Sequence, residues 1–193
     1  MNRFEYEVRH VMDGVNRFLQ TLENPHHRAI VENFRRHVHL EIAGEYEKIV
    51  APDMMVDHPV YRIAWGKNPM VIEGKENVLK FYYSVSDTVL WHSEDEYAVA
   101  DWGIASEMTF HQLTQGKNLK ALGFDIDDEE AIYHYKSRQA FIWPYDSQAR
   151  LIGEHIYEDP TTVVIEKVKP EEILTPQRAK EIHQKLLREY NLI

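Results

Sequence analysis

Histidine is the main chemical feature of this sequence, which has 11 histidines in 193 residues. Because a free imidazole titrates near pH 6.5, it can accept and return a proton close to neutral pH. Four histidines lie in segments with strand-like composition and are our candidate acid–base residues: His58, His92, His111 and His155. For each of them, a position at the surface or in the packed core is the alternative interpretation.

His58 is the leading candidate base. The stretch MMVDHPVYRI (residues 54–63) has the composition of a strand, in which neighbouring side chains point to opposite faces. We expect His58 and Val60 to face the core, and Asp57 and Tyr61 to face away from it. Asp57 would then be an outward anchor, while His58 meets a bound molecule.

A second pair with suitable spacing lies on a helix. His37 and Glu41 are four residues apart, so both side chains project from one helix face, which also carries Phe34. A carboxylate and an imidazole in an apolar stripe can orient each other. The alternative is that this end of the helix emerges into solvent and that the pair is a surface contact.

Two of the strand histidines share a face with other notable residues. Glu107 and His111 lie on the same strand face, which either lines a pocket or meets solvent. His155 shares its face with Gly153 and Tyr157. A glycine inside a strand leaves room for a ligand or marks a bulge, so this face is a candidate for lining a pocket.

Motifs for metals and cofactors are missing from the sequence. There is no cysteine, no His-Glu-x-x-His helix, no glycine-rich phosphate loop and no Gly-x-Ser-x-Gly elbow. Histidines on different strands converging on a metal remain the weaker alternative. We therefore expect neither a metal nor a cofactor.

Net charge and hydrophobic patterning exclude several classes of partner. The formal net charge of −10 argues against nucleic acid and against anionic membrane surfaces. No run of 18 apolar residues is present, and the first residues carry charges where a signal peptide needs an apolar run. The expected location is the cytoplasm.

The order of elements predicts an α+β fold. Apolar residues at steps of three and four predict one helix over 3–22 and another from Pro25 to a break at Gly44, followed by a short helix. A strand and a helix over 75–84 come next, then several long strands rich in β-branched and aromatic residues, with a turn expected at 116–118. A final helix is capped by Thr175. Helices on one face of a curved antiparallel sheet would enclose a conical cavity.

Four stretches resemble the nuclear transport factor 2-like superfamily, and within it the SnoaL-like proteins. They are FRRHVHLEIAGEYEKIVAPDMMVDHP, IEGKENVLKFYYSV, ADWGIASEMTF and RLIGEHIYEDPTTV. The resemblance covers residues 25–165, so we expect one domain over 1–193 with helical extensions at 1–23 and 170–193. It implies a cone in which a curved sheet wraps around helices.

The resemblance also implies a kind of activity. Active members of the superfamily perform acid–base chemistry on small, often cyclic molecules, as lyases, isomerases or cyclases; others bind a ligand or oligomerise without catalysis. His58 stands where the ketosteroid isomerase branch has its base, and His92 lies near the place of a dehydrochlorinase-like histidine. Residues expected to line the substrate pocket are His37, Glu41, Tyr61, Tyr83, Trp91, Tyr135 and Tyr157.

We predict that the protein is a homodimer. Members of this fold commonly pair through the open sheet, and the terminal helices carry apolar stripes that one small cone would leave in water. The stripes consist of Val8, Val11 and Val15, and of Ile182, Leu186 and Tyr190. Light scattering at micromolar concentration should give twice the chain mass of 22.9 kDa. A mass equal to one chain would contradict the prediction.

Overall fold

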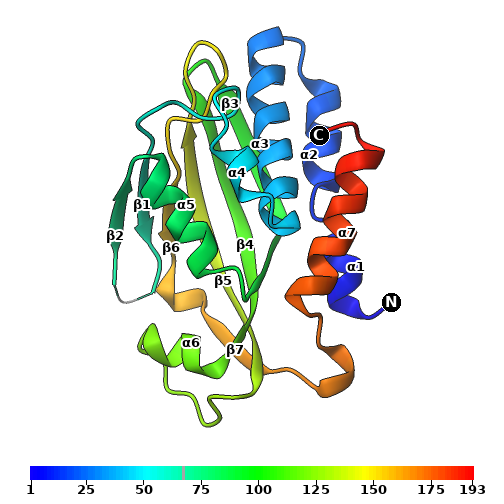
Figure 1. Ribbon diagram of the computed structural model, residues 1–193, viewed down its shortest axis with the longest axis vertical. Helices are drawn as coiled ribbons and strands as arrows, with labels where there is room; N and C mark the ends of the chain where they lie inside the picture. The colour runs from blue at the N-terminus through cyan, green and yellow to red at the C-terminus, as the bar shows by residue number, and fades with distance from the viewer. Residues whose placement is uncertain (67) are drawn as a thin grey trace.

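The computed structural model describes residues 1–66 and 68–193, and these residues form a seven-stranded sheet with helices packed against it (Figure 1). The strands are β1 (Val60–Ala64), β2 (Met70–Glu73), β3 (Val89–Ala100), β4 (Gly103–Gln115), β5 (Ile132–Pro144), β6 (His155–Glu158) and β7 (Val164–Lys167). The helices are α1 (Arg3–Arg9), α2 (Asp13–Thr21), α3 (Pro25–Ala43), α4 (Tyr46–Ile49), α5 (Lys75–Ser84), α6 (Gly116–Ala121) and α7 (Pro176–Glu189), with short 3₁₀ turns at Pro160–Thr162 and Pro170–Glu172.

The sheet follows the order β2-β1-β6-β5-β4-β3, and β7 pairs with the N-terminal part of β5. All neighbouring strands are antiparallel except β1 and β6, which run parallel. The long strands β3, β4 and β5 run the length of the molecule (Figure 1). Helix α3 lies alongside the sheet, and α2 and α7 pack against α3. The α+β class and the curved sheet expected from the sequence are confirmed.

The ends of α3 are set by local signals that the sequence shows. The Asn24 side chain accepts hydrogen bonds from the backbone N–H groups of the first turn, and Pro25 occupies the first helical position. Gly44 ends the helix with φ of 73°, a left-handed conformation that glycine adopts at little cost. The Thr175 cap of α7 is confirmed in the same way, because its hydroxyl accepts from the backbone N–H of Arg178.

The single helix expected over 3–22 is wrong. The segment forms two helices, α1 and α2, with a break at residues 10–12. Each half buries its apolar side chains against a different neighbour, since α1 packs against α7 and β3 while α2 packs against α3. The turn expected at 116–118 is also wrong, because these residues begin α6.

The apolar stripes of the terminal helices are buried within the chain. Val8, Val11 and Val15 are buried, as are Ile182 and Leu186. Tyr190 is the exposed member of the set. The apolar surface that motivated the dimer is therefore covered by the chain's own fold, and the dimer itself stays a prediction.

The expected register around His58 is wrong. Strand β1 begins only at Val60, and both Asp57 and His58 are exposed in an irregular segment before it. Pro59 has no N–H to donate to a ladder, so regular pairing starts after it. Within β1 it is Tyr61 and Ile63 that are buried. The side chain expected to face outward therefore faces the core.

Gly153 leaves room for backbone and not for a ligand. A Cβ atom at this position would lie 1.9 Å from the carbonyl oxygen of Val60. The two chain segments therefore approach each other closely immediately before β6. This approach fixes the position of the residue that follows, Glu154.

We predict that Gly153→Ala is strongly destabilising, because the methyl group can be accepted only if β1 and the segment before β6 move apart. Overpacking of this kind costs about 1–3 kcal/mol, and more where backbone must shift. Denaturant unfolding should show a lower midpoint for the variant. An unchanged midpoint would mean that the two segments are not held in contact.

Candidate acid–base site in the cone

An apolar cavity lies between α3 and the inner face of the sheet. The volume open to the centre of a water-sized sphere is about 60 Å³, and the whole space between the lining atoms, mouth included, is about 670 Å³. Its apolar and aromatic lining residues are Phe34, Val38, Ile42, Trp65, Phe81, Val85, Leu90, Trp91, Met108, Phe110, Phe141, Trp143 and Ile156. Three ionisable residues complete the wall, namely Glu41, His92 and Glu154. A narrow apolar space with a few polar groups is typical of a small-molecule site.

Glu154 is the most unusual of the three. It directly precedes β6, its residue surface is 7% exposed, and its side chain has no hydrogen-bond partner among the described residues. Burial raises the pKa of Glu154 well above its ordinary value of 4.5, and the charge of nearby Glu41 raises it further. Burial therefore favours the protonated form of this carboxyl group, which can donate a proton.

Glu41 stands at the end of a buried chain of polar contacts. The Tyr61 hydroxyl lies 2.8 Å from that of Tyr82, which lies 2.9 Å from Nε2 of His37. The same Nε2 is 3.7 Å from a carboxylate oxygen of Glu41, one helical turn further along α3. His37 is completely buried, so the interpretation of this pair as a surface contact is wrong. These polar contacts hold the Glu41 end of α3 against the polar wall of the cavity.

His92 lies on β3, and an acid orients it. Its Nδ1 is 2.8 Å from a carboxylate oxygen of Asp95, whose side chain is 7% exposed. A carboxylate can only accept, so Nδ1 of His92 carries a hydrogen and donates it to Asp95. Nε2 is buried without a partner among the described residues. An imidazole oriented in this way can exchange a proton with a bound molecule through Nε2.

The cavity brings together some of the expected site residues. Glu41, Trp91 and His92 line it, and His37 supports Glu41 from behind. Tyr61 is fully buried next to this cluster but does not line the cavity. The histidine expected on β3 is therefore in place, whereas the leading candidate His58 lies in solvent outside the cone.

His111 and His155 face away from the cavity. On β4, Met108 and Phe110 line the cavity, which puts His111 on the outer face of the sheet. On β6, Ile156 lines the cavity and His155 points the other way. The expected face of β6 is wrong because the alternation has the opposite phase: Glu154 and Ile156 line the cavity, and His155 between them faces away.

The expected tyrosines also lie elsewhere. Tyr83 and Tyr157 are 50% and 48% exposed, respectively. Tyr82 is the inward-facing member of the α5 pair, since consecutive helical residues cannot share a face. Tyr135 is buried at the far end of the sheet, where it packs with Leu119.

Sequence reasoning missed Glu154 and Trp143. Glu154 lies between Gly153 and His155, the two residues that were taken as the inward face. The available signal was the alternation of the last strand, since Glu154 and Ile156 share a face. Trp143 lies at the end of β5, and its ring meets Phe34 at a centroid distance of 5.0 Å.

Two further properties bear on the kind of site. Among residues 1–66 and 68–193, no three or more His, Asp or Glu side chains converge as metal ligands would. In the same ranges no helix has the length and apolar character that crossing a membrane requires.

Comparison with solved structures identifies the fold. A proposed SnoaL-like polyketide cyclase from Shewanella putrefaciens superposes with a TM-score of 0.55 at 11% identity, over 79% of this chain and 89% of that one. An NTF2-like protein from Anabaena variabilis gives 0.50 at 14% identity, over 72% and 93%. A Mycobacterium tuberculosis protein in complex with estradiol-17β-hemisuccinate gives 0.50 at 14% identity, over 70% and 98%.

The chain therefore has the nuclear transport factor 2-like fold of the SnoaL-like proteins. No protein-family model matches its sequence, and no curated protein matches it either. At these identities the likeness establishes the fold, and the chemistry has to be argued from this chain's own residues.

We predict that Glu154→Gln stabilises the protein increasingly as pH rises. A carboxyl group whose folded pKa is raised contributes its full stability below pH 4.5 and loses it as pH approaches the folded pKa. Glutamine cannot ionise, so the variant escapes this loss. The free energy of unfolding of Glu154→Gln relative to the wild type should grow by up to about 1.4 kcal/mol per pH unit as pH rises from 4.5 toward the folded pKa.

The matched control is Glu23→Gln, because Glu23 is exposed. Its free energy of unfolding should run parallel to that of the wild type at every pH. Denaturant unfolding between pH 4 and 8 measures all three proteins. Parallel curves for Glu154→Gln as well would show that Glu154 ionises normally in the folded state.

Proposed function

We propose that this protein is a cofactor-independent lyase, isomerase or cyclase that moves a proton on a small, largely apolar molecule bound in the cone. The observation that carries the proposal is an apolar cavity that holds both the buried carboxyl group of Glu154, whose pKa burial raises, and the imidazole of His92, which Asp95 orients. Two titratable groups kept in opposite roles by their surroundings are the usual basis of acid–base catalysis.

Glu154 acts as the proton donor in this proposal. A carbonyl or hydroxyl oxygen of the substrate would accept a hydrogen bond from the protonated carboxyl group. Developing negative charge on that oxygen is stabilised by a donor in a dry site much more than in water. The charge of Glu41 supports this role, because it raises the pKa of Glu154 and keeps the proton in place.

His92 acts as the proton acceptor. Asp95 fixes its tautomer and leaves Nε2 free to take a proton from a carbon or hydroxyl group. In the sheet, β3 is separated from β6 by β4 and β5, so His92 and Glu154 approach the cavity from different parts of its wall. A substrate between them could lose a proton on one side and gain one on the other.

Binding of a ligand without catalysis is the second candidate. It is favoured by the lining of the cavity, most of which is apolar or aromatic. The neighbour in complex with estradiol-17β-hemisuccinate gives this alternative a structural precedent. In this case Glu154 would be only a hydrogen-bond donor to the ligand.

We predict that Glu154→Gln and His92→Gln each lower turnover by about 10²- to 10⁴-fold, the usual contribution of a general acid or base. Ligands are first found by native mass spectrometry against small cyclic carbonyl and hydroxyl compounds, and turnover is then followed by NMR. Affinity should change only a few-fold, because the amides keep the shape of the site. Glu23→Gln should behave as the wild type.

The outcome separates the two candidates. Ligands that bind to the wild type and remain chemically unchanged, with the variants altering affinity alone, would establish the binding protein. Full turnover by both amide variants would show that neither group transfers the proton.

A further inference from the structure

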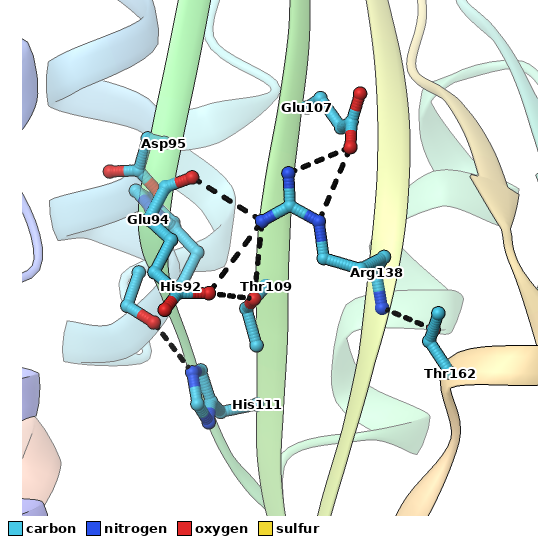
Figure 2. A network of polar contacts seen from close by, with 9 residues as sticks. His92, Glu94, Asp95, Glu107, Thr109, His111, Arg138 and Thr162 are labelled. Atoms are coloured by element: carbon cyan, nitrogen blue, oxygen red, sulfur yellow. Dashed lines mark hydrogen bonds and ion pairs between the residues drawn. The ribbon is translucent and has the colours of Figure 1, made fainter.

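A second group of interacting polar side chains lies outside the cone, on the outer face of the sheet. Oγ of Ser93 is 2.8 Å from Nε2 of His111, and Nδ1 of His111 is 2.9 Å from Nε2 of His134. The three residues come from β3, β4 and β5. Figure 2 shows the contact that His111 makes with the β3 side of the sheet. The acid–base site of the cone makes no use of this serine or of either histidine.

The order of these hydrogen-bonded groups is that of a nucleophilic serine with its base. In such arrangements the serine hydroxyl meets one imidazole nitrogen, and a third group accepts from the other imidazole N–H. Here His134 occupies the third position. The ring of Trp91 stacks on the His111 ring at a centroid distance of 4.9 Å and on that of His134 at 5.5 Å, so both imidazoles are fixed in one plane.

We propose that Ser93, His111 and His134 form an acyl-transfer site that hydrolyses small activated esters. Ser93 and His111 would be its catalytic residues, and His134 a positioning residue that holds the tautomer of His111. The two sites share no reacting group, but they are neighbours, because His92 and Asp95 of the cone site also line the hollow beside Ser93.

The backbone next to Ser93 is suited to stabilise an oxyanion. The pairing of β3 with β4 is interrupted between Ser93 and Glu96, and the two residues of the bulge have no partner in the ladder. Glu94 has φ of 54°, an unusual conformation for a residue other than glycine. Such outliers cluster at functional sites. We assign the backbone N–H groups of the bulge the role of oxyanion donors.

The proton state of the imidazoles limits the chemistry. Burial lowers the pKa of His111 to about 3 and that of His134 to about 4. Both rings are therefore neutral at pH 7, so His111 is free to accept the serine proton. A base this weak favours substrates with good leaving groups, which is why the class is restricted to activated esters.

An open hollow of about 520 Å³ beside Ser93 indicates the charge of the substrate. It lies between β3 and the two N-terminal helices, and its charged and titratable lining residues are Glu7, His10, Asp13, Arg17, His92, Glu94, Asp95 and Glu96. Carboxylates outnumber the basic groups. Glu94 forms an ion pair with Arg138 on β5, which offsets part of its charge (Figure 2). Glu7 accepts from Trp91, Asp13 contacts His10, and Asp95 contacts His92. The net charge of the hollow is still negative, which favours an ester that carries a positive charge.

The reaction consumes only the ester and water. Oγ of Ser93 forms a bond to the acyl carbon while its proton passes to Nε2 of His111, and the ester C–O bond breaks as that proton is given to the leaving oxygen. Water then attacks the acyl-serine, its proton moves to Nε2 and on to Oγ, and the carboxylic acid leaves. Serine and imidazole end in their original states.

The direct test is labelling with a fluorophosphonate, which phosphonylates serines that are activated by a base. The wild-type protein should take up one label, and peptide mass spectrometry should place it on Ser93. His111→Gln should lower the labelling rate at least 100-fold. Ser86→Ala is the matched control, because Ser86 bonds only to a backbone carbonyl of its own turn, and it should label as the wild type does.

The role of His134 is tested with two variants, one that keeps a hydrogen-bond acceptor and one that keeps only a flat ring. The amide oxygen of His134→Gln can still accept from Nδ1 of His111, so this variant should keep part of the labelling rate. His134→Phe keeps a flat ring without an acceptor and should lose the labelling. Circular dichroism of both variants separates this effect from loss of fold, which a purely structural role would produce.

The charge of the substrate is tested with two isosteric esters. Acetylcholine and 3,3-dimethylbutyl acetate, in which carbon replaces the ammonium nitrogen, are alkyl esters without an activated leaving group and serve here only as competitors for binding. Acetylcholine should protect Ser93 from labelling at a concentration at least 10-fold lower than 3,3-dimethylbutyl acetate. Equal protection would overturn the assignment of a cationic substrate. Failure of the folded wild-type protein to label at Ser93, or an unchanged rate in His111→Gln, would overturn the site as a whole.

Discussion

The burial of one carboxyl group, that of Glu154, is the constraint on which the candidate site depends. An ionised carboxylate in an apolar surrounding without a partner would cost several kcal/mol. Burial raises the pKa of Glu154 and favours the protonated form, which lowers this cost. The close backbone approach at Gly153 holds the residue in this position. The placement that favours a reactive proton therefore also costs stability as pH rises above 4.5.

Buried imidazoles that are kept neutral also lie where α1, α3 and α7 meet. His183 on α7 donates from Nε2 to the backbone oxygen of Val8, at 3.0 Å. Its Nδ1 is then an acceptor, and Nδ1 of His39 on α3 donates to it across 3.1 Å. Burial lowers the pKa of His39 to about 3 and that of His183 to about 4. This pair joins α1, α3 and α7, so part of the high histidine content serves packing.

Local signals of the sequence were sufficient for much of the fold. Asn24 with Pro25, Gly44 and Thr175 define helix ends through contacts within one turn, and such contacts do not depend on the rest of the chain. The break between α1 and α2 could not be found in this way. It arises because Val8 and Val15 are buried against different neighbours, which only the assembled structure determines.

The site was harder to predict, because a shift of one residue in the register of a strand moves each side chain to the opposite face of the sheet. His92 lies within a long regular strand, and its place at the cavity was among the expectations. His58 lies in an irregular segment before Pro59, where strand alternation does not apply. For His155 the alternation holds, but the sequence does not show which of its two faces points inward. Glu154 was overlooked because a glutamate is rarely buried without a partner.

The central claim is that Glu154 holds its proton at neutral pH inside the cone. Its most direct test is a pH titration of the side-chain carboxyl carbon by ¹³C NMR, assigned by comparison with Glu154→Gln. The account predicts a midpoint well above 4.5, and a resonance that remains that of the protonated acid through neutral pH. A midpoint at or below 4.5 would contradict it.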